Sequence, residues 1–411
     1  MSHALRFHFF LIITALLSAP SVLLMPWFAF ANPYSLRNFE GFVVEWESYY
    51  LLDTASHLLS GIPTGSTADG TDTDSFRALV PILLFSILIA ITGFPGLAYQ
   101  LTDIIFVALC ANFLFFLCIH YHLKPTTAYL ACILFITGPV SMSFMGGFGL
   151  HASHSSSLII ALYLALRYPL IAQQRLRRAF YLSLVFFLSS IMYNYHYLLM
   201  PFFILLSLYT HTDIWMSIAA VMLYYAIHYC VDFFLYLFGK PLISHNILNT
   251  PIIFIINNFT LLAPTLLSAV SFIQTSLLGY FSQLIYNLRT TILLFTLPIS
   301  ATAVLTAVLW RPPTLLLHFT IMLLITQAQS FVYNSSWTLT ATYPYVYMFA
   351  AQGIMRCYSY LIPPSTSRCH RPTYHIGLIS LSAIIHYFLV SRHWVGDTSY
   401  LKLWWAGRFL T

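Results

Sequence analysis

Ionised side chains are scarce in this chain of 411 residues. Charged residues make up 7% of it, whereas soluble domains carry about 25%. Hydrophobic residues make up 59%, and the mean hydropathy is +0.81. This composition excludes an ordinary soluble domain and predicts a polytopic membrane protein. Its spans should be α-helices, because lipid offers backbone polar groups no partner outside the segment itself.

The few charges that are present argue against a nucleic-acid partner. The net charge of +6 is modest, and Lys and Arg occur at the ends of apolar segments. That distribution is typical of topology signals rather than of a basic binding surface. The six cysteines lie in or beside apolar segments, with no metal-ligand spacing and no sign of a disulfide framework. The sequence shows no internal repeat, which disfavours a transporter built from two related halves.

Acidic residues are concentrated in one stretch after the first apolar segment. Seven of the 11 lie there: Glu40, Glu45, Glu47, Asp53, Asp69, Asp72 and Asp74. The rest of the chain contains Asp103, Asp213, Asp232 and Asp397. From Glu45 onward, aromatic residues and leucines alternate with polar residues at helical spacing until Gly61-Ile-Pro63 ends the pattern. We expect a short amphipathic helix here, lying at the membrane surface beside the carboxylates.

The apolar segments predict an all-α polytopic membrane protein of about 11 transmembrane helices, with short juxtamembrane helices in the first outer loop. Arg6 precedes the first span, which places its start in the cytosol and the acidic loop on the outer side. The chain forms one integral-membrane domain, 1–411. Its parts are a first span (7–31), an acidic outer loop with juxtamembrane helices (32–102), central spans (103–238), a second outer loop (239–288), C-terminal spans (289–391) and a tail (392–411).

A basic cluster at residues 175–178 decides between two topologies. If residues 78–100 cross the bilayer, this cluster lies on the outer side. If they only dip into the outer leaflet, the cluster and Lys124 both lie in the cytosol. Lys and Arg favour the cytosolic side, so we expect the dip. Residues 180–209 must then form two short spans, interrupted around residues 194–196 and Pro201.

The carboxylates of the first outer loop are candidates for chemistry. Glu47, with Glu45 or Asp53, would form a carboxylate site beside a membrane-surface helix. One carboxylate would act as general base on an incoming hydroxyl or amine. Another would hold a divalent metal ion that neutralises a phosphate leaving group. The alternative is a solvated acidic face without chemistry, which we favour for the acidic residues between positions 69 and 74.

The run Glu47-Ser-Tyr-Tyr-Leu-Leu-Asp-Thr-Ala-Ser-His-Leu-Leu-Ser-Gly-Ile-Pro63 resembles the first outer loop of GT-C glycosyltransferases. In that family the loop carries an acidic pair, an aromatic residue and then Ala, Leu-Leu and Gly. The resemblance puts Glu47 on the family's first acidic residue. Ser48 stands where a second acid is common, so Glu45 and Asp53 both remain candidates for the second carboxylate.

The resemblance extends to about Met200. An apolar segment ending in a Gly-rich turn is similar to the family's juxtamembrane helix, and residues 158–178 are similar to its fourth span. Ahead of that span the family has a second acidic residue, where this chain has His151 and His154. Their i, i+3 spacing puts them on one helical face. They would contact the donor phosphate or, with Glu47, hold a divalent ion such as Mg²⁺ or Mn²⁺.

Other candidates flank the outer side. Asp103 begins a predicted span, where it would either cap the helix or face the site. Lys240 and Arg289 border the second outer loop, where a cation would bind the donor phosphate. The segment Tyr343-Pro-Tyr-Val-Tyr347 is similar to a late segment of the family that often bears an Arg-Tyr pair, although the Arg is absent here.

The resemblance implies a membrane glycosyltransferase that moves a hexosyl or pentosyl group from a polyprenyl-phosphate donor to an acceptor on the outer or lumenal face. Its partners would be the lipid-linked donor and membrane lipids, in a bacterial inner membrane or the endoplasmic reticulum membrane. Two other functions fit the sequence. Asp232 lies inside a predicted span with His228 one turn earlier, as in a proton-coupled transporter, since intramembrane carboxylates are costly and usually functional. Low charge also suits a non-catalytic subunit of a membrane complex.

Overall fold

The computed structural model describes residues 36–37, 43–44, 79–93, 95–138, 151–167, 175–192, 196–210, 213–237, 297–310, 312–333, 342–361, 377 and 381. In this part of the chain the helices are α3 (Leu79–Thr92), α4 (Pro95–His120), α5 (Pro125–Ile136), α7 (His151–Arg167), α8 (Arg175–Met192), α9 (His196–Tyr209), α10 (Ile214–Leu237), α13 (Leu297–Trp310), α14 (Pro313–Tyr333) and α16 (Tyr343–Leu361). The strands β1 (Leu36–Arg37) and β2 (Val43–Val44) pair antiparallel, with Leu36 opposite Val44. Apart from this two-residue ladder, the predicted all-α class is confirmed for the described residues.

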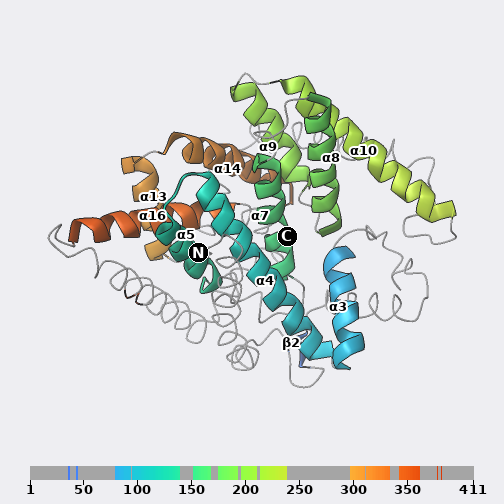
Figure 1. Cartoon of the computed structure of the whole chain (residues 1–411), viewed down its shortest axis with the longest axis horizontal. Coiled ribbons are helices and arrows are strands. Elements are labelled where there is room, and N and C mark those ends of the chain that lie inside the picture. The colour runs from blue at the N-terminus through green and yellow to red at the C-terminus, as the bar shows by residue number, and fades with distance from the viewer. Residues whose placement is uncertain are drawn as a thin grey trace, which may run out of the picture.

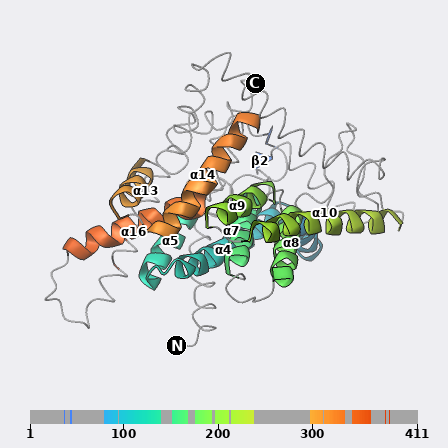
Figure 2. The same ribbon diagram turned by 90° about the horizontal axis from the view of Figure 1, so that it is seen from above.

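Two groups of helices flank a central pair. Figure 1 shows α4 and α7 side by side in the middle, with α8, α9 and α10 on one side and α13, α14 and α16 on the other. Seen from above, α14 is strongly inclined to both α4 and α10 (Figure 2). The described part is therefore not a bundle of parallel rods, and helices from distant parts of the sequence meet at its centre.

The turn between α4 and α5 is closed by a Schellman motif. The Leu123 N–H donates to the Cys118 carbonyl, and the His122 N–H donates to the Ile119 carbonyl, each at 3.0 Å. His122 adopts the left-handed conformation that this motif requires, with φ 58°. Pro125 then starts α5, at a position where its missing N–H leaves no helical bond unmade. The chain thus reverses within a few residues and sets α5 against α4.

The predicted interruption of residues 180–209 is confirmed between Met192 and His196, whereas the predicted break at Pro201 is wrong, because Pro201 lies inside α9. Helix α8 ends at Met192 and α9 begins at His196, so two short helices replace one long apolar segment. The hydroxyls of Ser207 and Ser217 lie 2.8 Å apart, which joins the end of α9 to the start of α10 in an antiparallel hairpin. The connection matches the topology in which residues 78–100 dip into the membrane.

Helices α4 and α7 run in the same direction. Phe106 of α4 packs with Ile160 of α7, and further along both helices the rings of Phe116 and Tyr163 lie 5.8 Å apart. Later residues of α4 thus contact later residues of α7, which happens only when two helices run parallel. The favoured topology predicts this relationship, because both segments run from the outer side to the cytosol.

Helices α8 and α10 also run parallel. The Arg175 Nε and Asp213 Oδ2 atoms lie 2.8 Å apart at the two helix starts. Well into both helices, the rings of Phe187 and His228 lie 6.4 Å apart. The two helices therefore begin at the same level, which places the basic cluster of residues 175–178 beside the start of α10.

The third parallel pair is α13 and α16. A Cβ atom on Gly353 would collide with the Thr306 side chain and lie 2.9 Å from that of Thr302, so the two backbones approach closely there. Three residues later the Arg356 guanidinium lies over the Trp310 ring, 5.1 Å from its centroid. A cation beside an aromatic ring is common at a membrane boundary, and the favoured topology puts both residues on the cytosolic side.

Helix α3 packs along part of α4. Val80 and Leu84 contact a cluster formed by Phe106, Ile160 and Met192. Gly93, with φ 72°, lies in the short connection before α4, so the two helices form a hairpin. The 14 residues of α3 rise about 21 Å, less than the roughly 30 Å of a hydrocarbon core. Its rise falls short of a perpendicular crossing, as does that of the 14-residue helices α9 and α13.

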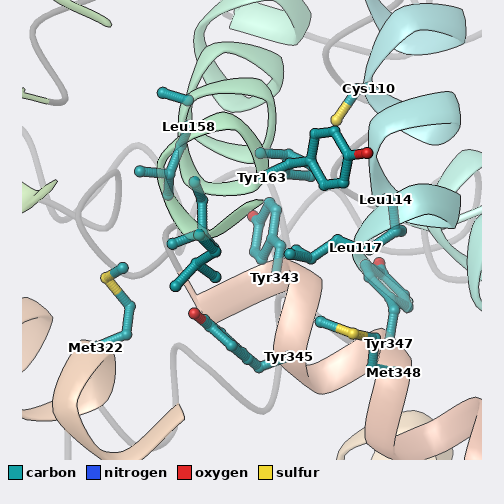
Figure 3. Close-up of a cluster of buried hydrophobic side chains, with 14 of the residues drawn as sticks. Cys110, Leu114, Leu117, Leu158, Tyr163, Met322, Tyr343, Tyr345, Tyr347 and Met348 are labelled. Atoms are coloured by element: carbon teal, nitrogen blue, oxygen red, sulfur yellow. The ribbon is translucent and has the colours of Figure 1, made fainter. Parts of the chain in front are cut away.

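Tyrosines at the start of α16 occupy the centre of the core. Tyr343, Tyr345 and Tyr347 are each exposed by 1% or less. Figure 3 shows them beside Leu114 and Leu117 of α4, Tyr163 and Leu158 of α7 and Met322 of α14. The Tyr347 ring lies 5.9 Å from Phe135 of α5. The first turns of α16 thus tie four other helices together.

Helix α10 is the described helix that is long and apolar enough to cross a bilayer, by length and composition. In its window Ile214–Val231, 17% of the residues are buried, and the others are partly or fully exposed. Trp215 and Met222 are exposed by 74% and 63%, with Ile218 between them on the same stripe. Contiguous exposed apolar surface of this kind is rare on soluble monomers and suits contact with lipid. The apolar parts of the other described helices are shorter, so the predicted number of spans is not established.

Candidate functional site

Most carboxylates and cations of the predicted outer site fall in parts of the chain that the structure does not describe. Glu45, Glu47, Asp53, Lys240 and Arg289 lie outside the described residues, and their predicted roles stay predictions. Strand β2 ends at Val44, directly before Glu45 in the sequence. A local ladder with β1 therefore fixes the chain just ahead of the acidic stretch, where the sequence alone indicated helices and loops.

Asp103 does not begin a helix, and its predicted role as a helix cap is wrong. Helix α4 starts at Pro95, so Asp103 lies more than two turns inside it. At that depth the backbone N–H groups are already bonded within the helix, and a carboxylate there meets no free helix terminus. The other prediction, that Asp103 faces the site, remains.

His151 and His154 occupy the first turn of α7. The sequence placed them in a loop ahead of a span beginning near residue 158, so the predicted helix boundary is wrong by two turns. The predicted i, i+3 relationship on one helical face is confirmed, because both residues are helical. Helix propensity is weak at Ser-rich starts such as this one, which is why the apolar pattern alone missed the first two turns.

The register of α4 on α7 places Asp103 near the start of α7, about one turn beyond His154. Phe106 meets Ile160, and Phe113 meets Tyr163 with ring centroids 5.6 Å apart. Extending that pairing toward the helix starts puts Asp103 opposite the first two turns of α7. Residues from two separate stretches of sequence thus share one end of the parallel pair, the end predicted to face outward.

The described residues hold no group of three or more His, Cys, Asp or Glu side chains able to bind a metal ion. The predicted site would combine His151 and His154 with Glu47, which lies outside those residues. Two histidines at i, i+3 on one helix supply adjacent ligands of a type that divalent transition ions accept, whereas Mg²⁺ prefers oxygen. Of the two ions predicted, Mn²⁺ fits this ligand pair better than Mg²⁺ does.

His228, proposed with Asp232 as a titrating pair, packs between aromatic rings. Its centroid lies 6.4 Å from Phe187 of α8 and 5.7 Å from Tyr224 of α10. Asp232 follows one turn later on α10. The two aromatic contacts explain the position of the His228 ring by packing, and the transporter role stays a prediction.

A polar pair that the sequence did not reveal lies at the opposite, predicted cytosolic end. The Tyr121 hydroxyl is 2.5 Å from Nδ1 of His318, across 197 positions of sequence. The His318 ring also contacts Phe202 of α9 at 5.6 Å, and the Tyr121 ring lies 6.3 Å from Tyr345. Burial raises the pKa of Tyr121 above its usual value, and the neighbouring Tyr345 raises it further.

This second group braces the fold rather than performing the predicted chemistry. It joins the α4–α5 turn to α9, α14 and α16, and its groups are neutral phenols and an imidazole held against aromatic rings. At the same end, the Arg167 guanidinium donates to the Tyr163 hydroxyl and lies 5.7 Å from the centre of its ring. The Arg167 contact lies within α7, and the Tyr121–His318 contact joins the α4–α5 turn to α14.

No protein-family model matches the sequence, and no curated protein matches it. Among solved structures, the chain is similar to ArnT from Cupriavidus metallidurans, crystallised with undecaprenyl phosphate bound. The match covers 96% of this chain and 75% of that chain, with 8% sequence identity and a TM-score of 0.48. The low score and identity leave both fold and function to be inferred from the residues of this chain.

Proposed function

We propose that the chain is an integral-membrane glycosyltransferase that moves a sugar from a polyprenyl-phosphate donor to an acceptor on the outer or lumenal face. The observation that carries the proposal is the acidic loop from Glu45 to Pro63, whose residues resemble the first outer loop of GT-C enzymes. A chain with 11 acidic residues places seven of them in or beside this loop, at the predicted water boundary. Such a concentration suits a site that handles a charged lipid head group.

The register of α4 and α7 supports a site at the same end. Both helices are predicted to start on the outer side, and they run parallel, so the parts of the chain that hold Asp103, His151 and His154 lie toward the same end of the pair. Sugar transfer from a lipid phosphate needs a base for the acceptor and positive or hydrogen-bonding groups for the departing phosphate. Carboxylates and histidines at one end of a helix pair provide both kinds of group.

In this proposal Glu47 takes the proton from the acceptor hydroxyl or amine, and Glu45, Asp53 or Asp103 supports it. His151, His154, Lys240 and Arg289 would bind the donor phosphate, as the sequence predicts. A divalent ion bound by Glu47 and the two histidines would offset the charge of the leaving phosphate. Without such an ion, a protonated histidine and the two cations would do so.

The direct test is transfer by the purified chain. The full-length protein in lipid nanodiscs is incubated with a panel of radiolabelled polyprenyl-phosphate hexoses and pentoses, together with a membrane extract as the source of acceptors. We expect one donor to release its polyprenyl phosphate in step with the appearance of label in an acceptor. If no donor in the panel is consumed above the level of empty nanodiscs, while circular dichroism shows a folded helical protein, the proposal is wrong.

A further inference from the structure

A surface at the predicted cytosolic ends of α8, α9 and α10 combines exposed cations with exposed apolar side chains. We call it the basic–aromatic edge and define it by Arg175, Leu176, Arg177, Phe180, Tyr209 and Trp215. Two contacts hold its parts together. The Arg175–Asp213 ion pair joins the start of α8 to that of α10, and the Ser207–Ser217 hydrogen bond joins α9 to α10.

The charge of this edge is positive. Asp213 is the acidic residue that the described part of the chain places here, and Arg175 pairs with it at 2.8 Å. The Arg175 side chain nevertheless remains 84% exposed, so its guanidinium still has donors directed to solvent. Arg177 is exposed as well. An anion arriving at this edge meets an excess of guanidinium groups.

The same edge exposes large apolar and aromatic side chains. Leu176 is 76% exposed and Phe180, one turn later on the same face, is 51% exposed. Tyr209 and Trp215 are exposed by 66% and 74% at the neighbouring helix ends. Tyr and Trp gather where hydrocarbon meets the head-group layer. The edge therefore has an apolar part for acyl chains directly beside a cationic part for phosphate.

We propose that the basic–aromatic edge binds anionic phospholipid of the cytosolic leaflet. The lipid phosphate would accept hydrogen bonds from Arg177 and from the free face of Arg175, and the acyl chains would cover Leu176 and Phe180. A soluble anion would satisfy only the arginines and leave the apolar side chains in water. An acidic protein surface would supply carboxylates for the arginines but no acyl chain for Leu176 and Phe180. The combination favours a lipid, and this binding is independent of sugar transfer.

The test uses the full chain purified in a neutral detergent. Thermal stability and lipid retention in native mass spectrometry are measured while phosphatidylglycerol or phosphatidylcholine with the same acyl chains is added. We expect tighter binding of phosphatidylglycerol, weakened about fivefold by Arg177→Gln, since a cation near an anionic surface contributes about 1 kcal/mol. The matched control is Lys124→Gln, which removes an exposed cation from the α4–α5 turn and should leave the affinity unchanged.

Two results would overturn the proposal. One is equal affinity of the protein for the two lipids. The other is an equal loss of phosphatidylglycerol affinity in Arg177→Gln and Lys124→Gln, because that result would mean that any surface cation attracts the lipid. A competition arm with glycerol phosphate separates lipid from a free anion. The lipid proposal predicts no displacement of phosphatidylglycerol at matched concentration, whereas full displacement would make the edge a soluble-anion site and contradict it.

Discussion

The Tyr121 hydroxyl and Nδ1 of His318 lie 2.5 Å apart, although 197 positions separate the two residues in the sequence. The contact connects the turn after α4 with the second turn of α14. Because His318 is 6% exposed, water does not replace a lost partner easily. The pair is therefore one of the points at which the early and late halves of the chain depend on each other.

Replacing Tyr121 with Phe should destabilise the fold by about 1–3 kcal/mol, because the His318 ring nitrogen loses its partner in a buried setting. Tyr209→Phe serves as the control, since Tyr209 is 66% exposed and its hydroxyl can reach solvent. The measurement is the thermal unfolding midpoint in one detergent. Equal midpoints for the two variants would contradict a structural role for the Tyr121–His318 bond.

Alkaline pH should reduce the contribution of Tyr121 to the free energy of unfolding. Burial raises the pKa of Tyr121 above the usual value of about 10, so the folded state favours the neutral phenol. The stability that this group provides is fully present below pH 10 and falls as the pH rises toward the folded-state pKa. The difference in unfolding free energy between the wild type and Tyr121→Phe should therefore be constant from pH 7 to 9 and shrink above pH 10. A stability difference that grows above pH 10 would contradict this prediction.

Gly138→Ala should loosen the contact between α5 and α16. A Cβ atom there would overlap the Tyr347 hydroxyl and lie 3.0 Å from the Leu134 carbonyl oxygen. Overpacking of this kind costs about 1–3 kcal/mol. Gly377→Ala is the matched control, since nothing lies within 4 Å of its added Cβ. Adding Tyr347→Phe to Gly138→Ala removes the overlapping oxygen and should recover part of the loss. If the losses of unfolding free energy in the two single variants simply add in the double variant, overlap with the Tyr347 hydroxyl is not the cause of the destabilisation by Gly138→Ala.

Membrane topology can be read from cysteine accessibility. The exposed native cysteines at 230 and 357 and the one at 369 are replaced with Ser, while the three buried thiols on α4 and α5 are kept. Single cysteines are then placed at Lys124, Arg177 and Lys240. In intact cells an impermeant maleimide should label only position 240, and all three after permeabilisation. Labelling of positions 124 and 177 from outside would show that residues 78–100 cross the bilayer.

The sequence predicted the helical class and the interruption around residues 194–196, because composition and apolar run length carry both signals. The parallel course of α4 and α7 also agrees with the topology inferred from the positions of Lys and Arg. The sequence misplaced the start of α4 by two turns, since the predicted span begins at Asp103 and α4 begins at Pro95. Hydropathy indicates what can lie in lipid, and it does not show where a helix ends.

The site was only partly accessible to the same reasoning. The spacing of His151 and His154 is local and could be read directly. Their position along the helix pair relative to Asp103 depends on how Phe106 and Phe113 of α4 pack against α7. That packing is a tertiary contact, which the local sequence does not specify. The Tyr121–His318 bond had no signal at all, because a Tyr and a His in separate apolar segments are common and nothing in either segment specifies the other.

The most direct test of the proposed glycosyltransferase is the activity of Glu47→Gln. The substitution removes the proposed base while keeping the size of the side chain and an oxygen acceptor. Membranes containing equal amounts of the wild type, Glu47→Gln and the control Asp72→Asn, a carboxylate of the same loop, are assayed for sugar transfer from polyprenyl phosphate. We predict a loss of about 100-fold or more for Glu47→Gln and wild-type activity for Asp72→Asn. Undiminished transfer by Glu47→Gln would contradict the assignment.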